Sequence, residues 1–261
     1  MALHIQVLAS GSKGNSILIA SGKTRLLVDA GLSGRELERR LDKSPVTASR
    51  LDGILISHEH IDHVRGLGVM SRRHRLPVYL NRGTLDGLPS TVGEIGKPRI
   101  FTTGTSFKIN DLTIHPFTVP HDAAECVGFV IESGQSRVGI CTDLGYPTHL
   151  VRERLKECDC LVLEFNHDPQ MLLDGPYPYP VKQRIKSRHG HLSNREAAEL
   201  LAELHHERLR AVAMAHMSQT NNRPDLVHAE LERLLEQAEY WREVQFELCG
   251  QDQAGSPFEV E

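Results

Sequence analysis

The sequence predicts an α/β fold in which two sheets face each other and helices cover their outer sides. The chain has 261 residues, of which 39% are hydrophobic, so one large domain can bury a sizeable core. Short apolar runs with strand patterns alternate with segments of helical spacing, in the order strands, helix, strands, helix. Because this pattern contains no internal repeats or low-complexity linkers, we expect a single domain over 1–261.

The first half of the chain predicts short strands and two helices. Apolar runs separated by Gly/Ser turns predict strands at 5–8, 17–19, 25–28 and 53–56. The glycines and asparagine within 11–15 suit a tight hairpin loop. A helix is predicted over 32–41, with Ser33 as its N-cap, and a second helix over 64–75.

In the second half, 105–119 and 127–141 alternate like hairpin strands. A helix is predicted over 193–207, because an N-cap candidate is followed by an apolar stripe at helical spacing. The range 225–239 repeats that design. Both helices should lie outside the two facing sheets.

The segment 174–189 differs from its surroundings, since it is rich in proline and tyrosine and then becomes basic. Proline fixes an extended geometry, so an extended loop is predicted here. Its tyrosines either stack on bases or sugars or pack inward as a rigid cover over the sheet edge. The sequence leaves both interpretations open.

Four side chains that can bind a metal fall within six positions, directly after the apolar run 54–56. They are His58, His60, Asp62 and His63. Imidazole and carboxylate are ligands of Zn²⁺, and they also suit Mn²⁺ and Fe²⁺, so the loop leaves the metal open. Two groups of ligands on one loop suggest two metals, which together can clamp both oxygens of a displacement reaction.

Three further candidate ligands directly follow apolar runs that have the pattern of a strand. They are His121, Asp143 and His216. A lone histidine after a strand is more often a hydrogen-bonded surface or core residue. Together with the loop, however, these three residues complete a set of seven, and strand ends provide the rigid platform that a metal site needs.

These seven residues resemble the site of the metallo-β-lactamase-fold hydrolases, whose signature is His-x-His-x-Asp-His. The resemblance implies a four-layer αββα sandwich and two divalent metal ions. The first ion would be bound by His58, His60 and His121. The second would be bound by Asp62, His63 and His216. Asp143 would bridge the two ions.

Three more motifs make the chain similar to the WalJ/YycJ branch of this family. They are Leu-Glu-Phe-Asn-His-Asp at 163–168, Gly-His-Leu-Ser-Asn at 190–194 and Ala-His-Met-Ser-Gln-Thr-Asn-Asn at 215–222. The branch is described as metal-dependent exonucleases, related to ribonuclease Z and to PhnP-type phosphodiesterases. The resemblance therefore implies a phosphodiester hydrolase, most specifically a 5′-to-3′ DNA exonuclease.

The resemblance also implies that Glu164 supports His191, as a glutamate supports the histidine of a Gly-His-Ser-Thr motif in ribonuclease Z. Here Leu192 interrupts that motif between His191 and Ser193. A bound metal lowers the pKa of water from about 15.7 toward 7. His191 would then give a proton to the leaving oxygen, while Asp62 is an alternative that could orient the water.

Two other enzyme classes fit the same ligands. A small-molecule cyclic phosphodiesterase would use the same chemistry in a compact pocket. A thioesterase of the glyoxalase II type would use the same metals without the Glu164 and His191 pair.

The charge of the chain gives mixed indications about a nucleic-acid partner. A formal net charge of −4 counts against one, but divalent cations would add positive charge at the site. Basic side chains also cluster just before His191, at Lys182, Arg184, Lys186, Arg188 and His189. A basic run is usually a solvated face, which is our interpretation of 72–75. The run before His191 leads into a catalytic candidate, so contact with substrate phosphates is expected there.

Five cysteines without a regular framework argue against a disulfide-stapled secreted fold. We found no apolar N-terminal segment typical of a signal peptide and no apolar run long enough to span a bilayer, so a cytoplasmic enzyme is expected. Only 72 residues separate Asp143 from His216, which leaves no room for the β-CASP insertion of ribonuclease J and Artemis. The oligomeric state stays open, a homodimer included.

Overall fold

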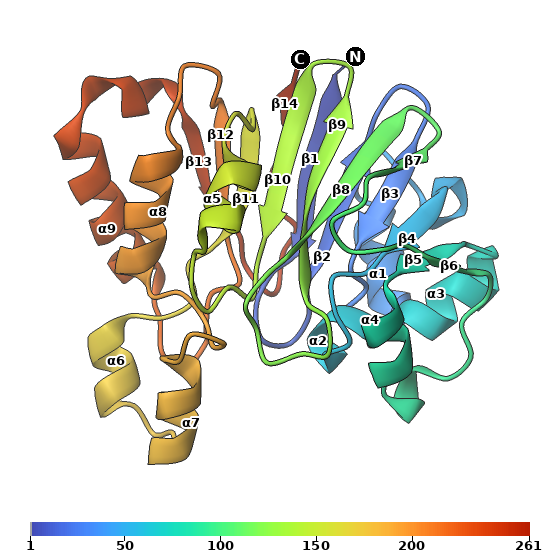
Figure 1. Ribbon diagram of the computed structural model, residues 1–261, viewed down its shortest axis with the longest axis horizontal. Coiled ribbons are helices and arrows are strands. Elements are labelled where there is room, and N and C mark those ends of the chain that lie inside the picture. Colours follow the sequence, from blue (N-terminus) through green and yellow to red (C-terminus); the bar gives the residue numbers. More distant parts are fainter. Residues whose placement is uncertain (1) are drawn as a thin grey trace.

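Two seven-stranded sheets face each other in the computed structural model, which describes residues 2–261 (Figure 1). The first sheet has the order β14 (Phe258–Val260), β1 (Leu3–Ala9), β2 (Ser16–Ala20), β3 (Arg25–Val28), β4 (Gly53–Leu55), β5 (Val78–Leu80) and β6 (Pro98–Ile100). The second has the order β13 (Gln245–Leu248), β12 (Ala211–Ala215), β11 (Cys160–Glu164), β10 (Ser136–Cys141), β9 (Val127–Ser133), β8 (Leu112–Thr118) and β7 (Phe107–Ile109).

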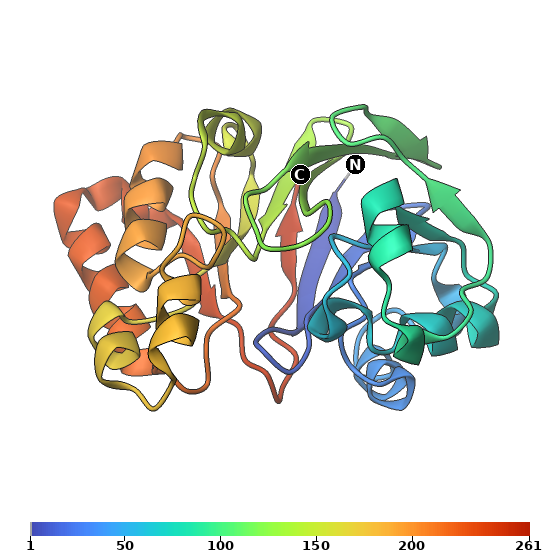
Figure 2. The same ribbon diagram turned by 60° about the horizontal axis from the view of Figure 1, so that its bottom comes forward.

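Helices flank the sheets and complete a four-layer αββα sandwich, as predicted (Figures 1 and 2). The first half contributes α1 (Gly34–Leu41), α2 (Ile61–Val64), α3 (Leu67–His74) and α4 (Arg82–Gly87). The second half contributes α5 (His149–Leu155), α6 (Pro169–Asp174), α7 (Tyr179–Ile185), α8 (Asn194–Leu204) and α9 (Pro224–Gln237). Short 3₁₀ turns lie at Ala48–Arg50, Ser90–Val92 and Glu239–Glu243. Within residues 2–261, none of the helices combines the length and the apolar character needed to cross a membrane.

The central core lies between the sheets. Ile5 and Ile19 from the first sheet belong to one buried cluster with Phe129, Ile140 and Val162 from the second. Burying a side chain of this size stabilises the fold by about 1.5–3 kcal/mol relative to leaving it exposed. This shared layer fixes the two sheets, and therefore the loops at their edges, relative to each other.

Outer cores attach the helices to the sheets. Leu37 of α1 and Met70 of α3 pack in the cluster behind the first sheet. Leu200 and Leu201 of α8 pack behind the second sheet. Ser33 caps α1 as predicted, because its side chain accepts a hydrogen bond from the backbone N–H of Glu36.

The N-cap prediction for α8 is also confirmed. Ser193 accepts a hydrogen bond from the backbone N–H of Glu196, whose carboxylate accepts one in return from the backbone N–H of Ser193. The two hairpins of the second sheet match 105–119 and 127–141. Each range forms a pair of antiparallel strands, β7 with β8 and β9 with β10.

The helix predicted over 64–75 is confirmed as α3, but it starts later than predicted, because Gly66 separates α3 from the short helix α2. The backbone N–H of Gly66 donates to the carbonyl of Ala30, and a Cβ at this position would approach the carbonyl oxygen of Leu32 to 2.3 Å. The chain can therefore pass this point only with glycine, and the close approach separates the metal loop, residues 57–63, from α3.

The extended loop predicted over 174–189 is wrong, since α7 is helical. Pro180 lies in the first turn of α7, where a missing N–H costs no hydrogen bond. The helix and its neighbour α6 form an arm, residues 169–185, that projects from the sandwich (Figures 1 and 2). None of the α7 side chains is buried, and Tyr179 is 72% exposed, so an inward-packed cover is excluded for this tyrosine.

The parallel strands bring the predicted site residues to one edge of the sandwich. Strands β3 and β4 run parallel in the first sheet, and β10, β11 and β12 run parallel in the second. Parallel strands share a carboxyl edge, where ligands bind in open α/β sheets. The metal loop follows β4, and Asp143, Glu164 and His216 lie at the ends of β10, β11 and β12.

Candidate metal centre

Seven side chains converge between the two sheets, and they are the seven candidates identified in the sequence. Two sets can each place three donor atoms within 4.8 Å of one another. The first donor set consists of His58, His60 and His121. The second donor set consists of Asp62, His63 and His216.

Asp143 lies between the two donor sets. One of its carboxylate oxygens, Oδ2, is 3.1 Å from His63 Nε2. The other, Oδ1, is 3.5 Å from His216 Nε2 and 3.7 Å from His121 Nε2. The carboxylate therefore faces residues of both sets, which is the placement a bridging ligand requires.

Backbone strain accompanies this convergence. Asp29, Asp143 and His216 have φ angles of 60°, 56° and 56°, in the left-handed region that non-glycine residues seldom adopt. Asp29 and His216 directly follow β3 and β12, and Asp143 lies two residues after the end of β10. Such conformations cost about 1–3 kcal/mol each, and here they turn side chains into the space between the sheets.

The second donor set is oriented by buried carboxylates. His63 Nδ1 donates to Asp29 Oδ2 at 2.8 Å, and His216 Nδ1 donates to Glu164 Oε1 at 2.7 Å. Because each Nδ1 is occupied, each Nε2 is directed at the centre. A carboxylate behind a histidine fixes the ring and raises its basicity, as in metal sites generally.

Neutral oxygens orient the first donor set. Ser57 Oγ donates to Asp29 Oδ2 at 2.8 Å, so its lone pair can accept from His58 Nδ1 at 3.0 Å. His121 Nδ1 donates to the carbonyl of Gly190 at 3.1 Å. The Nε2 of His58 is buried without a hydrogen-bond partner, and leaving such a group unpaired costs about 1–3 kcal/mol.

Protonation of the second donor set shows how strongly the centre attracts positive charge. Burial alone would lower the pKa of His63, but the carboxylates of Asp143 and Asp29 outweigh burial and raise that pKa well above its usual value. Burial likewise opposes the charge on His216, yet Asp143, together with the hydrogen bonds to Asp62 and Glu164, raises its pKa to about 10. Protons on these histidines thus balance buried carboxylates, and a divalent cation would take their place.

His58 behaves in the opposite way and fits the same conclusion. Burial and the neighbouring His63 hold the pKa of His58 well below its usual value, so its ring is neutral. A neutral imidazole with a free, buried Nε2 is ready to bind a metal. Both donor sets therefore fit divalent cations.

Glu164 and His191 are paired as the sequence implied. Glu164 is fully buried, and its Oε1 accepts hydrogen bonds from His191 Nδ1 at 2.8 Å and from His216 Nδ1. Burial would raise the pKa of Glu164, but the charge and hydrogen bond of His191 lower it to about 2. The side chain of His191 is 17% exposed, so its Nε2 can reach a bound molecule.

The basic run lies beside the centre, but most of its members already have partners. Arg184 Nε is 2.5 Å from Asp122 Oδ2, and Asp122 follows the ligand candidate His121. Lys182 Nζ donates to the carbonyl of Leu173 at 2.6 Å. Arg188 lies 4.5 Å above the ring centre of Tyr146, in the geometry of a cation–π contact. Lys186 is exposed to solvent, where it can contact a substrate.

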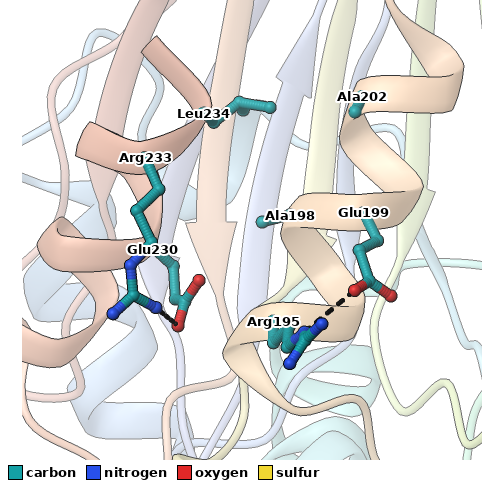
Figure 3. Close-up of a pocket in the computed structure, with 7 residues that line it drawn as sticks. All are labelled: Arg195, Ala198, Glu199, Ala202, Glu230, Arg233 and Leu234. Atoms are coloured by element: carbon teal, nitrogen blue, oxygen red, sulfur yellow. Dashed lines mark hydrogen bonds and ion pairs between the residues drawn. The ribbon is translucent and has the colours of Figure 1, made fainter. Parts of the chain in front are cut away.

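A groove of about 380 Å³ between α8 and α9 is separate from this centre (Figure 3). Its charged side chains are held in pairs within each helix, Arg195 with Glu199 at 3.0 Å and Arg233 with Glu230 at 2.6 Å. The walls come from α8 and α9, while the donor sets come from the strand edge. The groove therefore takes no part in the site.

Sequence reasoning missed two residues that organise the centre, Asp29 and Asn15. Asp29 supports both His63 and Ser57 from the end of β3, and Asn15 contacts the backbone and carboxylate of Asp62. A signal for Asp29 was present, because it closes the apolar run 25–28 as Asp143 closes 138–142. Asn15 was attributed to a hairpin loop alone.

Comparisons with known proteins agree with the geometry. The model of the beta-lactamase superfamily domain matches residues 24–217. The chain is 35% identical to exodeoxyribonuclease YycJ of Bacillus anthracis over 254 residues, which cover 97% of this chain and 96% of the relative. It is 34% identical to exodeoxyribonuclease WalJ of Streptococcus pneumoniae over 246 residues, which cover 93% and 91%.

Solved structures share the fold. The metallo-beta-lactamase fold protein YhfI of Bacillus subtilis superposes with a TM-score of 0.72, at 19% identity over 99% of both chains. The short form of human tRNase Z has a TM-score of 0.65, at 18% identity over 97% of this chain and 98% of the other. At these identities the likeness concerns architecture alone.

Proposed function

The chain belongs to the beta-lactamase superfamily and is a metal-dependent hydrolase, and we propose that it removes nucleotides from a 5′ end of DNA with two divalent metal ions. The observation that carries this proposal is the position of Asp143 between two donor sets, with the Glu164 and His191 pair beside it. The relatives YycJ and WalJ are identical to this chain at about a third of the aligned positions, and the alignments cover nearly the whole chain. Their names as exodeoxyribonucleases support DNA as the substrate.

In this proposal the first donor set would hold one ion and the second donor set would hold the other, with the carboxylate of Asp143 available to both. Zn²⁺ and Mn²⁺ both suit imidazole and carboxylate ligands, as does Fe²⁺. When bound, such ions lower the pKa of water and neutralise the charge of a phosphodiester. The protein contributes the fixed positions, which the carboxylates of Asp29 and Glu164 secure from behind.

His191 is the proposed proton donor. Glu164 accepts the hydrogen of Nδ1, so the proton that is available to a substrate sits on Nε2. Transfer of that proton to the leaving oxygen would complete cleavage of the phosphorus–oxygen bond. Asp62 is proposed to have a second role besides metal binding. One of its carboxylate oxygens can accept a hydrogen bond from the attacking water and so orient it.

The basic run would contact the nucleic acid beyond the scissile bond. Arg184 would have to leave Asp122 to bind a phosphate, whereas Lys186 is exposed and needs no such exchange. Tyr179 on the same arm is exposed and can stack on a base. Binding of a polymer is therefore proposed to rearrange the arm.

A small-molecule cyclic phosphodiesterase is the second candidate, and one observation favours it. Three members of the basic run are already engaged, Lys182 with a carbonyl, Arg184 with a carboxylate and Arg188 with an aromatic ring. A substrate that ends at the metal centre would leave those contacts in place.

A substrate panel separates the two candidates. Protein reconstituted with Mn²⁺ or Zn²⁺ would be given end-labelled single- and double-stranded DNA and RNA, bis(p-nitrophenyl) phosphate, a cyclic nucleotide and a glutathione thioester. The exonuclease predicts shortening of DNA. Hydrolysis of the small diesters with every polymer left intact would contradict it and favour the cyclic phosphodiesterase, while thioester hydrolysis alone would indicate a thioesterase.

We also propose that the enzyme works in the cytoplasm. All five cysteines are free thiols and are buried, which suits a reducing compartment.

A further inference from the structure

The hairpin loop of residues 10–15, here called the N-terminal loop, contacts every member of the second donor set. Asn15 donates from its backbone N–H to the carbonyl of Asp62 at 2.8 Å. Its side-chain Nδ2 lies 3.3 Å from Asp62 Oδ2 and 3.1 Å from His63 Nε2. At the other end of the loop, Ser10 Oγ accepts a hydrogen bond from the backbone N–H of His216 at 2.5 Å.

The first donor set is supported from other segments. His58 Nδ1 contacts Ser57 Oγ at 3.0 Å, and His121 Nδ1 contacts the carbonyl of Gly190 at 3.1 Å. The support of the two donor sets is therefore divided between different parts of the chain. A change in the N-terminal loop should affect the two sets unequally.

The loop itself is held from the C-terminal segment by Gln251, which is 8% exposed. Gln251 Nε2 donates to the carbonyl of Gly14 at 2.8 Å, and its Oε1 accepts from the backbone N–H of Lys13 at 2.8 Å. Ser10 adds a backbone hydrogen bond to the carbonyl of Gly250 at 3.1 Å. One side chain thus satisfies a donor and an acceptor of the same tight loop.

Asn15 is fixed within this loop by its own side chain. Its Oδ1 accepts a hydrogen bond from the backbone N–H of Gly11 at 2.8 Å, and its carbonyl accepts one from Gly31 at 2.9 Å. A Cβ on Gly31 would come within 1.6 Å of the carbonyl oxygen of Asp62. The amide is 4% exposed and has a single orientation that serves both Gly11 and Asp62.

We propose that Asn15 is a positioning residue that presents Asp62 to the second metal ion, and that Gln251 holds Asn15 in place across the chain. This inference rests on the proposed function only in treating the two donor sets as two metal sites. Outer partners of metal ligands change metal affinity by about 10- to 100-fold. Gln251 touches no donor atom of either set, so any effect of Gln251 on metal binding must pass through the loop.

The test measures binding of Zn²⁺ alone to protein that was freed of metal, in two backgrounds. In His121→Ala, which impairs the first donor set, Asn15→Ala should raise the Zn²⁺ dissociation constant by about 10-fold. Gln251→Ala should act in the same direction with a smaller effect, and Gln251→Glu, which keeps the acceptor for Lys13, should restore part of the affinity. In His216→Ala, which impairs the second set, the same changes should leave the constant nearly unchanged.

Gln253→Ala is the matched control, because Gln253 has the same side chain and lies two residues away but is exposed. It should leave Zn²⁺ binding unchanged in both backgrounds. Hydrogen exchange gives a second readout, which can be measured in the wild type as well as in the two variants with an impaired donor set. Zn²⁺ should slow exchange of the amides of the N-terminal loop in wild type and in His121→Ala, and should fail to do so in His216→Ala.

Equal weakening in both backgrounds would reduce Asn15 and Gln251 to general stabilisers of the fold and would overturn the proposal. Unchanged exchange in the N-terminal loop of wild type would overturn it as well. The proposed function fails separately. A wild-type protein that binds Zn²⁺ as described but leaves DNA intact would refute the exonuclease and keep the positioning role.

Discussion

Individual residues at this centre have different proposed roles, since some position the metal ligands and His191 transfers a proton. His191 is the test of proton transfer, because its Nδ1 is held by Glu164 while its ring remains partly exposed. We predict that His191→Ala lowers turnover by about 100- to 10,000-fold, the usual contribution of a general acid, with metal content and DNA affinity retained. Glu164→Gln should act in the same direction, and since Glu164 also supports His216, it should weaken metal binding too. If His191→Ala hydrolysed a substrate with a poor leaving group at the wild-type rate, the assignment of His191 as the proton donor would be contradicted.

The titration of His216 predicts how the stability of the metal-free protein depends on pH. The pKa of His216 is raised from 6.5 to about 10, so the protonated ring stabilises the metal-free fold. That stabilisation is complete below pH 6.5 and is lost as the pH rises through 10. The free energy of unfolding of the metal-free protein, measured with urea, should therefore fall between these values. His216→Gln should show a smaller fall, and the metal-loaded wild type should show one smaller than the metal-free protein. An equal fall in His216→Gln would assign the effect to other groups.

At the scale of elements, the basic run on and after α7 decides how a polymer would be held. Replacing Lys182, Arg184, Lys186 and Arg188 by Ala should weaken DNA binding and flatten its salt dependence by about 0.7 per lost phosphate contact on single strands. Hydrolysis of bis(p-nitrophenyl) phosphate should remain nearly intact, because these side chains lie outside the donor sets. Gel-shift titrations over a salt series provide the measurement. As a control, Ala substitutions at Arg72, Arg73 and Arg75 should leave the salt slope unchanged, since 72–75 lies at the exposed end of α3. A slope that the α7 substitutions leave unaltered would argue for a small-molecule substrate.

Some helices and strands could be predicted from the sequence and others could not. Strand ends and N-caps are local features, so the positions of β3, α1 and α8 follow from the apolar pattern and from Ser33 and Ser193. The helical arm does not follow, because the proline pattern of 174–189 fits both an extended chain and the first turn of a helix. The break at Gly66 depends on the close approach of Leu32, which is more than thirty positions away in the chain, and no local pattern records it. The same reason explains Asn15, whose role depends on contacts with Asp62 and with a loop held by Gln251.

At the scale of the whole molecule, the sandwich assembles one centre from both halves of the chain. The first sheet supplies Asp29 and the metal loop, and the second supplies Asp143, Glu164 and His216. The sequence identifies the seven side chains that the structure brings together, because each follows a strand or belongs to a family signature. The grouping of two donor sets around Asp143 is implied by the family resemblance, and the structure adds the contacts of Asp29 with His63 and of Glu164 with His216. Asp143→Asn should accordingly weaken both metal sites together, whereas His216→Ala should weaken chiefly one, as judged by metal content after dialysis. Loss of a single ion in Asp143→Asn would argue against a bridge.

We propose that two metal ions, held between the sheets, drive removal of nucleotides from a 5′ end of DNA. The most direct test of this proposal is a titration of metal-free protein with Mn²⁺ or Zn²⁺ while release of label from 5′- and 3′-labelled DNA is followed. We predict that activity saturates at two metal ions per chain and that the 5′ label is released first, as short products. Saturation at one ion per chain, or earlier release of the 3′ label, would contradict the account.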